Sequence, residues 1–205
     1  NASDIEGLTD GTYFTVLTNP SHGAATIHPQ SGNWTYTPSA NYFGNDSFQV
    51  KVTDDLQGTA TAVLHMTVNP VDDPAIITGD FNATINEDGV ATGDLNASDI
   101  EGLTDGTYFT VLTPPTHGAA TIHPVTGLWT YTPSANYFGP DVFQVKVTDD
   151  LQGTTTAVLN MTVNPVDDPA IITGDFNATI NEDGVATGDL NASDVEGLTD
   201  GTYFT

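Results

Sequence analysis

Acidic residues gather in the loops of this chain, and their carboxylates are suited to binding a divalent cation. The sequence holds 27 acids and only two bases, Lys51 and Lys146, for a net charge of −25. Close carboxylates therefore have almost no Lys or Arg to pair with, and their mutual repulsion opposes folding. Calcium accepts roughly six to eight oxygen ligands from carboxylates, amides and backbone carbonyls. The composition thus favours calcium as the source of the missing positive charge.

Apart from Asp80 and Asp94, the acids of residues 72–166 fall at five points along the sequence. These are Asp72 with Asp73, Glu87 with Asp88, Asp99 with Glu101 and Asp105, Asp141, and Asp149 with Asp150. The Asp-x-Glu spacing at 99–101 presents two carboxylates to one point, and we interpret this pair and the 72–73 pair as calcium ligands. The alternative is that loop aspartates serve turns and stay solvated. We favour that alternative for Asp10 and Asp105, for Asp80 and Asp175, and for Asp94 and Asp189.

The positions of these acids repeat with a period of 95 residues. Residues 1–15 return unchanged at 96–110, and they return at 191–205 with Val195 in place of Ile100. Residues 1–95 and 96–190 differ by nine substitutions without insertion or deletion. A period of this kind indicates an array of identical structural units. The chain starts and stops at the same phase of the repeat, which we interpret as a window on a longer array.

Each period reads as β-structure. Phe48, Val50 and Val52 alternate with polar residues, as expected for a strand with one buried face. In the central period we predict strands at 75–86 (which could break near Gly79), 90–97, 107–113, 119–123, 128–132, 142–148 and 154–164. Seven short strands separated by turns predict an all-β fold of tandem seven-stranded antiparallel Greek-key sandwiches, joined end to end. Trp34 and Trp129 alternate inward and are predicted to lie in the core.

The segment Asn69-Pro-Val-Asp-Asp-Pro74, repeated at 164–169, is a candidate linker. Its two prolines favour a stiff, extended connection. Divided there, residues 1–71 form a partial repeat that lacks the first strand and most of the second. Residues 72–166 form a complete repeat, and residues 167–205 hold the first two strands and the start of the third strand of another repeat.

End-to-end stacking would bring acids from three segments together at each linker. In such a sandwich the 99–105 and 149–150 loops lie at the end where the chain enters, and the 87–88 turn and Asp141 lie at the end where it leaves. The second junction is predicted to gather Asp167, Asp168, Glu87, Asp141, Asp194 and Glu196. The first is predicted to gather Asp72, Asp73, Asp46, Asp99 and Glu101, with Asp149 in a loop at the entering end.

The same composition argues against several other classes of protein. The strong negative charge disfavours binding to nucleic acid or to anionic membranes. No apolar stretch approaches the roughly 20 residues that span a bilayer, so no membrane insertion is predicted. His22 and His28 lack a third convergent ligand for zinc. No catalytic motif stands out, and we predict that the chain is not an enzyme.

The run Asn-Tyr-Phe-Gly-Asn-Asp-Ser-Phe-Gln-Val-Lys-Val-Thr-Asp at 41–54, with Gly58 and the 69–74 linker, resembles bacterial cadherin-like and immunoglobulin-like tandem repeats. Such repeats occur in giant RTX-type adhesins and in VCBS-containing surface proteins. The resemblance implies a sandwich module whose interdomain calcium stiffens a long extracellular stalk. It matches Asp72 and Asp73 to the linker acids, Asp99 and Glu101 to a loop pair, and Glu87 to a turn glutamate. The family often has a longer Asp-x-Asp-Gly-Asp run at the loop pair, so the number of ions at a junction stays open.

These observations predict a structural spacer of an extracellular adhesin or surface filament, with calcium at the junctions. Its partners would be neighbouring identical repeats, and host or matrix surfaces would be reached through other domains. One alternative is a fibre subunit that polymerises head to tail by strand complementation. The other is a carbohydrate-binding module, which requires an exposed aromatic platform.

Overall fold

Every regular element among the described residues is a β-strand, as the alternating sequence pattern predicts. The computed structural model describes residues 8, 13–104, 106, 108–198 and 204. Asp10 and Asp105, expected to be solvated, lie outside these residues. The chain divides into two units, residues 1–73 (unit 1) and 74–205 (unit 2). No helix in the described part has the length and apolar character needed to cross a membrane.

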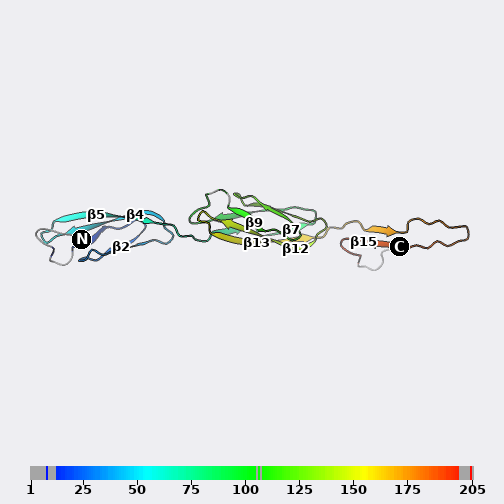
Figure 1. Cartoon of the computed structure of the whole chain (residues 1–205), viewed down its shortest axis with the longest axis horizontal. Coiled ribbons are helices and arrows are strands. Elements are labelled where there is room, and N and C mark those ends of the chain that lie inside the picture. Colours follow the sequence, from blue (N-terminus) through cyan, green and yellow to red (C-terminus); the bar gives the residue numbers. More distant parts are fainter. Residues whose placement is uncertain (1–7, 9–12, 105, 107, 199–203, 205) are drawn as a thin grey trace. The chain divides into compact units, whose positions relative to one another are not determined.

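Unit 1 contains five strands that form two separate sheets (Figure 1). The strands are β1 (Phe14–Thr18), β2 (Gly23–Ile27), β3 (Trp34–Pro38), β4 (Gly44–Thr53) and β5 (Thr59–Val68). β4 pairs with both β1 and β5 in an antiparallel sheet, while β2 and β3 form a hairpin.

Unit 2 contains a complete repeat, followed by a strand pair. The complete repeat comprises β6 (Ile76–Gly79), β7 (Asn82–Asn86), β8 (Ala91–Ser98), β9 (Phe109–Thr113), β10 (Gly118–Ile122), β11 (Leu128–Pro133), β12 (Gly139–Thr148) and β13 (Thr154–Asn164). Its two four-stranded sheets have the orders β10-β11-β8-β6 and β7-β13-β12-β9. The strand pair that follows is β14 (Ile171–Gly174) with β15 (Leu190–Ser193).

The core of the complete repeat lies between its two sheets. Leu95, Trp129 and Tyr131 enter it from one sheet, and Phe143 and Leu159 enter it from the other. The rings of Trp129 and Phe143 meet edge to face, with their centroids 6.0 Å apart. Inward side chains recur at every second residue of each strand, so the alternation in the sequence sets which face is buried.

The predicted all-β sandwich is confirmed, and the predicted strand boundaries lie within three residues of those observed. The first predicted strand does break after Gly79, whose φ of 124° favours glycine. Its first half, β6, pairs with β8, and its second half, β7, runs parallel to β13 in the other sheet. The strand predicted at 142–148 begins earlier, at Gly139, because β12 pairs with β13 along its whole length.

Two tryptophans with the same local sequence differ in burial. Trp129 is 1% exposed, as predicted, whereas its counterpart Trp34 is 45% exposed, so the prediction of a core position is wrong for Trp34. In the complete repeat β8 pairs with β11 alongside Trp129. No strand of the described residues takes that place beside β3 in unit 1.

Candidate metal centre

Glu87 sits in a tight turn that holds its carboxylate at the end of β13. The turn follows β7, is closed by the Gly89 N–H bonding to the carbonyl of Asn86, and places Asp88 at a positive φ of 62°. The backbone N–H of Glu87 donates to the carbonyl of Asn164 at 2.9 Å. The side chain is only 3% exposed, and its Oε1 accepts a hydrogen bond from the Val166 N–H at 2.6 Å. Its Oε2 is buried without a hydrogen-bond partner.

Two more carboxylates approach Glu87, one from the linker and one from the loop after β15. Asp168 belongs to the linker, and its N–H donates to Oε2 of Glu196 at 3.2 Å. Glu196 is held by Asp194, whose Oδ1 accepts the N–H groups of Glu196 and Gly197. Asp168 and Glu196 each retain one buried carboxylate oxygen without a hydrogen-bond partner.

The three acids form a single group. One carboxylate oxygen from each of Glu87, Asp168 and Glu196 lies within 4.8 Å of the other two. At this separation each pair of charges repels by roughly 3 kcal/mol or more, with an effective dielectric constant of about 20. The chain offers only Lys51 and Lys146 against its 27 acids, and both lysines lie on strands rather than in these loops. A cation between the three carboxylates would turn this repulsion into attraction.

The donor set suits calcium better than other common metals. All three side chains are carboxylates, and hard oxygen ligands of this kind are preferred by calcium and magnesium. Zinc sites usually include histidine or cysteine, which this group lacks. Each acid has a buried oxygen for which the described protein offers no donor, which is the feature expected of a cation ligand. These residues therefore fit a calcium ion at the second junction.

Asp141 and its counterpart Asp46 were expected among these ligands, but the structure turns them inward. Asp141 is 5% exposed and accepts hydrogen bonds from the N–H groups of Thr116, His117 and Val142 and from the hydroxyl of Tyr131. Asp46 is bonded in the same way by Ser21, His22, Ser47 and Tyr36. Because their oxygens already have partners within the repeat, neither joins the group of three acids.

Burial raises the pKa of the Asp141 carboxyl, but the hydrogen bonds from His117, Thr116, Val142 and Tyr131 together hold it below its usual value. Burial and the bond to Asp141 also raise the pKa of the Tyr131 hydroxyl, so it stays a donor. A carboxyl whose pKa falls on folding stabilises the fold above its unfolded pKa, about 4 for Asp, and loses that contribution as the pH falls.

Acidification is therefore expected to erase the stability difference between the wild type and Asp141→Asn. The difference in free energy of unfolding should be full at neutral pH and should shrink as the pH falls below about 4. Urea unfolding of both proteins at a series of pH values measures it. A difference that stays constant, or that grows toward low pH, would contradict the role of the ionised carboxylate.

The remaining predicted ligands occupy other places. Asp194 positions Glu196 through the turn described above, and Asp167 is exposed. In the complete repeat, Asp99 and Asp149 each use Oδ1 to accept two backbone N–H groups of their own loops, and each has a buried Oδ2 without a hydrogen-bond partner. The two loops meet, as predicted, through Thr104 and Asp150.

The predicted grouping at the first junction stays a prediction. Asp72 and Asp73 end unit 1, whereas Asp99 and Glu101 belong to unit 2. In the 95-residue period, Asp73 and Glu101 occupy the positions of Asp168 and Glu196. Two of the three acids of the metal centre, Asp168 and Glu196, therefore have counterparts at the first linker.

Sequence reasoning missed the backbone groups that complete the site and the inward turn of Asp141. The N–H of Val166 and the carbonyl of Asn164 form hydrogen bonds with Glu87. Every residue except proline has both backbone groups, so the sequence does not indicate which of them bind the side chain. Asp141 did leave a signal. It shares the parity of Phe143 and Val145 along β12, so alternation places it on the core face.

The repeat is recognisable among known domains. A model of the bacterial Ig domain family matches residues 1–67 and again residues 72–162. The chain belongs to the bacterial Ig domain family. The two family matches leave residues 68–71 between them, in the linker whose counterpart at 164–169 carries Asp168. Glu87 lies within the second matched domain, and Asp168 and Glu196 follow it along the chain.

The bacterial Ig domains of this chain also share their fold with cadherins. Protocadherin gamma B7 (extracellular domains 1–4) matches with a TM-score of 0.55 and 17% identity, over 92% of this chain and 51% of that one. Human cadherin-23 (domains EC21–23) matches with a TM-score of 0.54 and 15% identity, over 95% of this chain and 77% of that one. Drosophila N-cadherin (EC1–4) matches with a TM-score of 0.52 and 14% identity, over 83% of this chain and 46% of that one.

This chain spans about half the length of the protocadherin and N-cadherin chains. At these identities the likeness concerns the fold alone. No curated protein matches the sequence.

Proposed function

We propose that this chain is a structural spacer of an extracellular bacterial adhesin or surface filament, stiffened by calcium bound where one repeat meets the next. Bacterial Ig and cadherin-like domains are typically extracellular. Two observations carry the proposal: Oε2 of Glu87 is buried without a hydrogen-bond partner, and one carboxylate oxygen from each of Glu87, Asp168 and Glu196 lies within 4.8 Å of the other two. A cation would offset the cost of burying this glutamate, which is 3% exposed in a chain with 27 acids and two bases.

The proposed ion ties together three segments that otherwise meet through few bonds. Glu87 comes from the turn after β7, Asp168 from the linker, and Glu196 from the loop after β15. Among the described residues, hydrogen bonds here run from the Glu87 N–H to the carbonyl of Asn164, from the Val166 N–H to Glu87 and from the Asp168 N–H to Glu196. Binding all three carboxylates to one ion would fix the direction of the linker. Repeated at every junction, this would keep a long array extended.

Glu87→Gln is expected to weaken calcium binding at this junction by about a hundredfold, because one charged ligand is lost. Glutamine keeps an oxygen that accepts the Val166 N–H, so the turn itself should persist. Glu182→Gln is the matched control, because Glu182 lies 95 residues further on in an identical local sequence and is exposed. Calcium titration by calorimetry compares the two variants with the wild type.

Stiffening is measured at the same junction with spin labels. The chain has no cysteine, so labels can be placed at Thr162 and Thr173, which are exposed on β13 and β14 on either side of the linker. Calcium should narrow the distance distribution in the wild type and in Glu182→Gln but not in Glu87→Gln. If chelation leaves the wild-type distribution unchanged, the spacer mechanism is wrong.

The carbohydrate-binding alternative has less support. Trp34 is an exposed aromatic residue of the kind that such a module would use, but it occupies the position of the core residue Trp129. Trp34 is exposed because no strand of the described residues lies beside β3 as β8 lies beside β11, and its exposure is therefore not evidence for a sugar-binding surface. No catalytic role is proposed.

A further inference from the structure

The two bases of this chain lie at equivalent places on the repeat. Lys146 is on β12, and Lys51 is on β4, 95 residues earlier. The inward side chains of β12 include Phe143, Val145 and Val147, so alternation directs Lys146 out of the sandwich. Neither lysine forms a salt bridge with a described residue, although the chain has 27 acids. Both amines can therefore meet the carboxylates of a partner.

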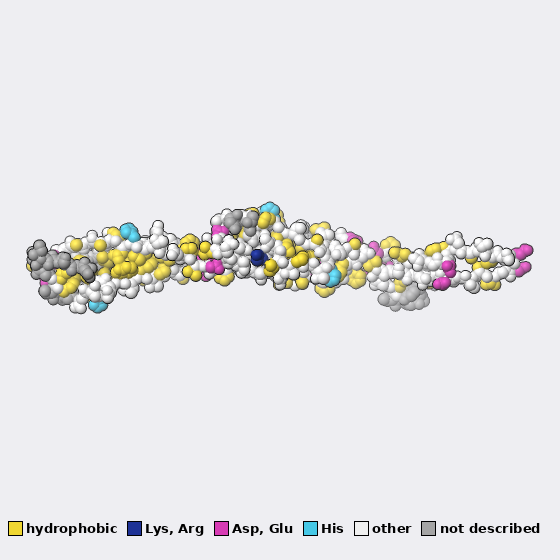
Figure 2. Space-filling model, viewed as in Figure 1, with side chains coloured by type: hydrophobic (Ala, Val, Ile, Leu, Met, Phe, Trp, Pro, Cys, Tyr) yellow, Lys and Arg dark blue, Asp and Glu magenta, His cyan; other side chains and the backbone are white. Residues whose placement is uncertain are grey.

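The sheet face around Lys146 has no outward acid. Its four strands, β7, β13, β12 and β9, contain a single acid, Asp141, which points into the core. The other outward side chains of this face are uncharged, and they include the exposed Val142 and Val158. Figure 2 shows a lysine near the middle of the complete repeat, with acidic side chains toward the ends of that repeat. We call this surface the lysine face.

The outer face of the other sheet has the opposite charge. Its strands, β10, β11, β8 and β6, contain one acid and no base. This acid, Asp94, is exposed on β8, and its N–H donates to Oδ2 of Asp80, which follows β6. The N–H of Asp80 donates to the carbonyl of Asp94 at 2.9 Å, so the two residues stay close together. We call this surface the aspartate face.

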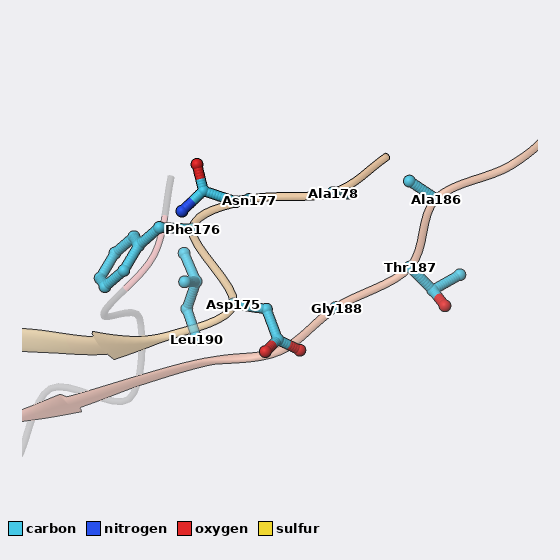
Figure 3. Close-up of a pocket in the computed structure, with 8 residues that line it drawn as sticks. All are labelled: Asp175, Phe176, Asn177, Ala178, Ala186, Thr187, Gly188 and Leu190. Atoms are coloured by element: carbon cyan, nitrogen blue, oxygen red, sulfur yellow. The ribbon is translucent and has the colours of Figure 1, made fainter. Parts of the chain in front are cut away.

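The same pair of acids recurs one period later. Asp175 and Asp189 lie 95 residues after the first pair, and the Asp189 N–H donates to Oδ2 of Asp175 at 3.4 Å. Figure 3 shows the carboxylate of Asp175 extending toward the chain at Gly188. The pair of aspartates therefore follows from the local sequence of the repeat.

We propose that the lysine face of one copy of this chain binds the aspartate face of a second copy, so that repeats stack side by side. Lys146 would meet Asp94 and Asp80 across the contact. Both faces also carry exposed apolar side chains, such as Val158 on the lysine face and Leu128 on the aspartate face. Two aspartate faces, or two lysine faces, would bring like charges together, so charge selects the pairing of unlike faces.

Both faces lie within residues 76–164, which form the complete repeat, so the contact does not depend on the sequence before or after it. Because the two contacting surfaces differ, each repeat can bind a neighbour on either side, and rows of copies can grow. The strands of one face cover roughly 500 Å². A standard interface buries about 800 Å² on each partner, so one repeat should bind weakly and several repeats on one chain should bind more firmly.

Zero-length cross-linking tests the contact. A carbodiimide takes up water as it joins a lysine amine to a carboxylate, and Lys51 and Lys146 are the two side-chain amines of the chain. Unlabelled chain is mixed with chain labelled with heavy nitrogen, at millimolar concentration and low salt in EGTA, so that calcium plays no part. Mass spectrometry should find links between the two isotopic forms that join a lysine to Asp80, to Asp94 or to their counterparts.

Charge reversal gives an independent measurement. The lysine-face variant combines Lys51→Glu with Lys146→Glu. The aspartate-face variant reverses the strand acids and neutralises their neighbours, through Asp94→Lys, Asp189→Lys, Asp80→Asn and Asp175→Asn. Each variant should associate about tenfold more weakly than the wild type in sedimentation, because attraction between the faces becomes repulsion. Asparagine retains an acceptor oxygen, and every substituted residue is at least partly exposed, so both variants should stay folded.

An equimolar mixture of the two variants should regain the association of the wild type, because every face then has a partner of opposite charge. General repulsion between acidic chains predicts a different result. The aspartate-face variant is less negative than the wild type, so general repulsion alone would let it associate more strongly, whereas the proposed contact predicts weaker association.

Three results would overturn the proposal. One is a wild type that gives no links between the two isotopic forms. Another is a set of links that run from the lysines to loop acids such as Asp88 or Asp167 in place of the aspartate face. The third is a mixture of the variants that associates no more strongly than either variant alone. None of these results bears on the calcium ion proposed at the junction, because all the measurements are made without calcium.

Discussion

Trp129→Ala is expected to lower the free energy of unfolding of the complete repeat by about 3–5 kcal/mol. Trp129 is 1% exposed, and its ring contacts Phe143 and the backbone of Gly93. Removing the ring leaves a cavity between the two sheets. The indole Nε1 has no hydrogen-bond partner in the core, so losing it recovers part of the cost and favours the lower end of the range.

The matched variant is Trp34→Ala, and its effect on unit 1 should be less than half as large. Trp34 is 45% exposed and retains an edge-to-face contact with Phe48, at a centroid distance of 5.9 Å. Hydrogen exchange of the β12 and β4 amides reports the two units separately. Equal costs at both positions would contradict the difference in burial.

Asp141→Ala is expected to destabilise the complete repeat by about 3–5 kcal/mol, a loss as large as that of a core ring. The substitution leaves the N–H groups of Thr116, His117 and Val142 and the hydroxyl of Tyr131 without their acceptor. These groups lie around a side chain that is 5% exposed, so water does not replace the carboxylate easily.

Asp80→Ala is the control for the loss of one negative charge. Asp80 is exposed, and its Oδ2 accepts a hydrogen bond from the Asp94 N–H at 3.2 Å. Its loss should cost about 1 kcal/mol or less. Urea unfolding at neutral pH, with hydrogen exchange of β10 and β12, measures both variants. Similar costs for the two aspartates would mean that the network around Asp141 contributes little.

The proposed calcium ion and Asp141 would act on different parts of the molecule, so variants of Glu87 and of Asp141 should change different properties. Glu87→Gln should change calcium affinity and the mobility of the linker while the core of the complete repeat keeps its stability in the absence of calcium. Asp141→Ala should lower the stability of the core while calcium affinity at the junction and the mobility of the linker stay unchanged. The two acids lie near the same end of the repeat, because Asp141 is paired with Met161 on β13 and Glu87 is bonded to Asn164. Proximity along the fold therefore does not decide which acid faces the junction.

The strands themselves were predictable because local signals agree. Alternation in Phe48-Gln-Val-Lys-Val, the turn residues between strands and the break at Gly79 all depend on residues within a few positions of each other. The candidate acidic ligands were predictable for the same reason, because both the excess of acids over bases and their positions in loops follow directly from the sequence. Of the acids predicted at the second junction, the structure brings Glu87, Asp168 and Glu196 together.

The sequence by itself determined the period, the all-β fold and the supply of carboxylates at the linkers, because each follows from composition and short-range pattern. Both Glu87 and Asp141 were predicted ligands, and tertiary structure alone decided that Glu87 faces the other two acids while Asp141 is bonded within the core. It also decided that Trp129 is buried while Trp34, in nearly the same local sequence, is open. The physical reason is the same in both cases. Burial depends on strands far away along the chain, and β8 covers Trp129 from more than thirty positions earlier, whereas no strand of the described residues covers Trp34.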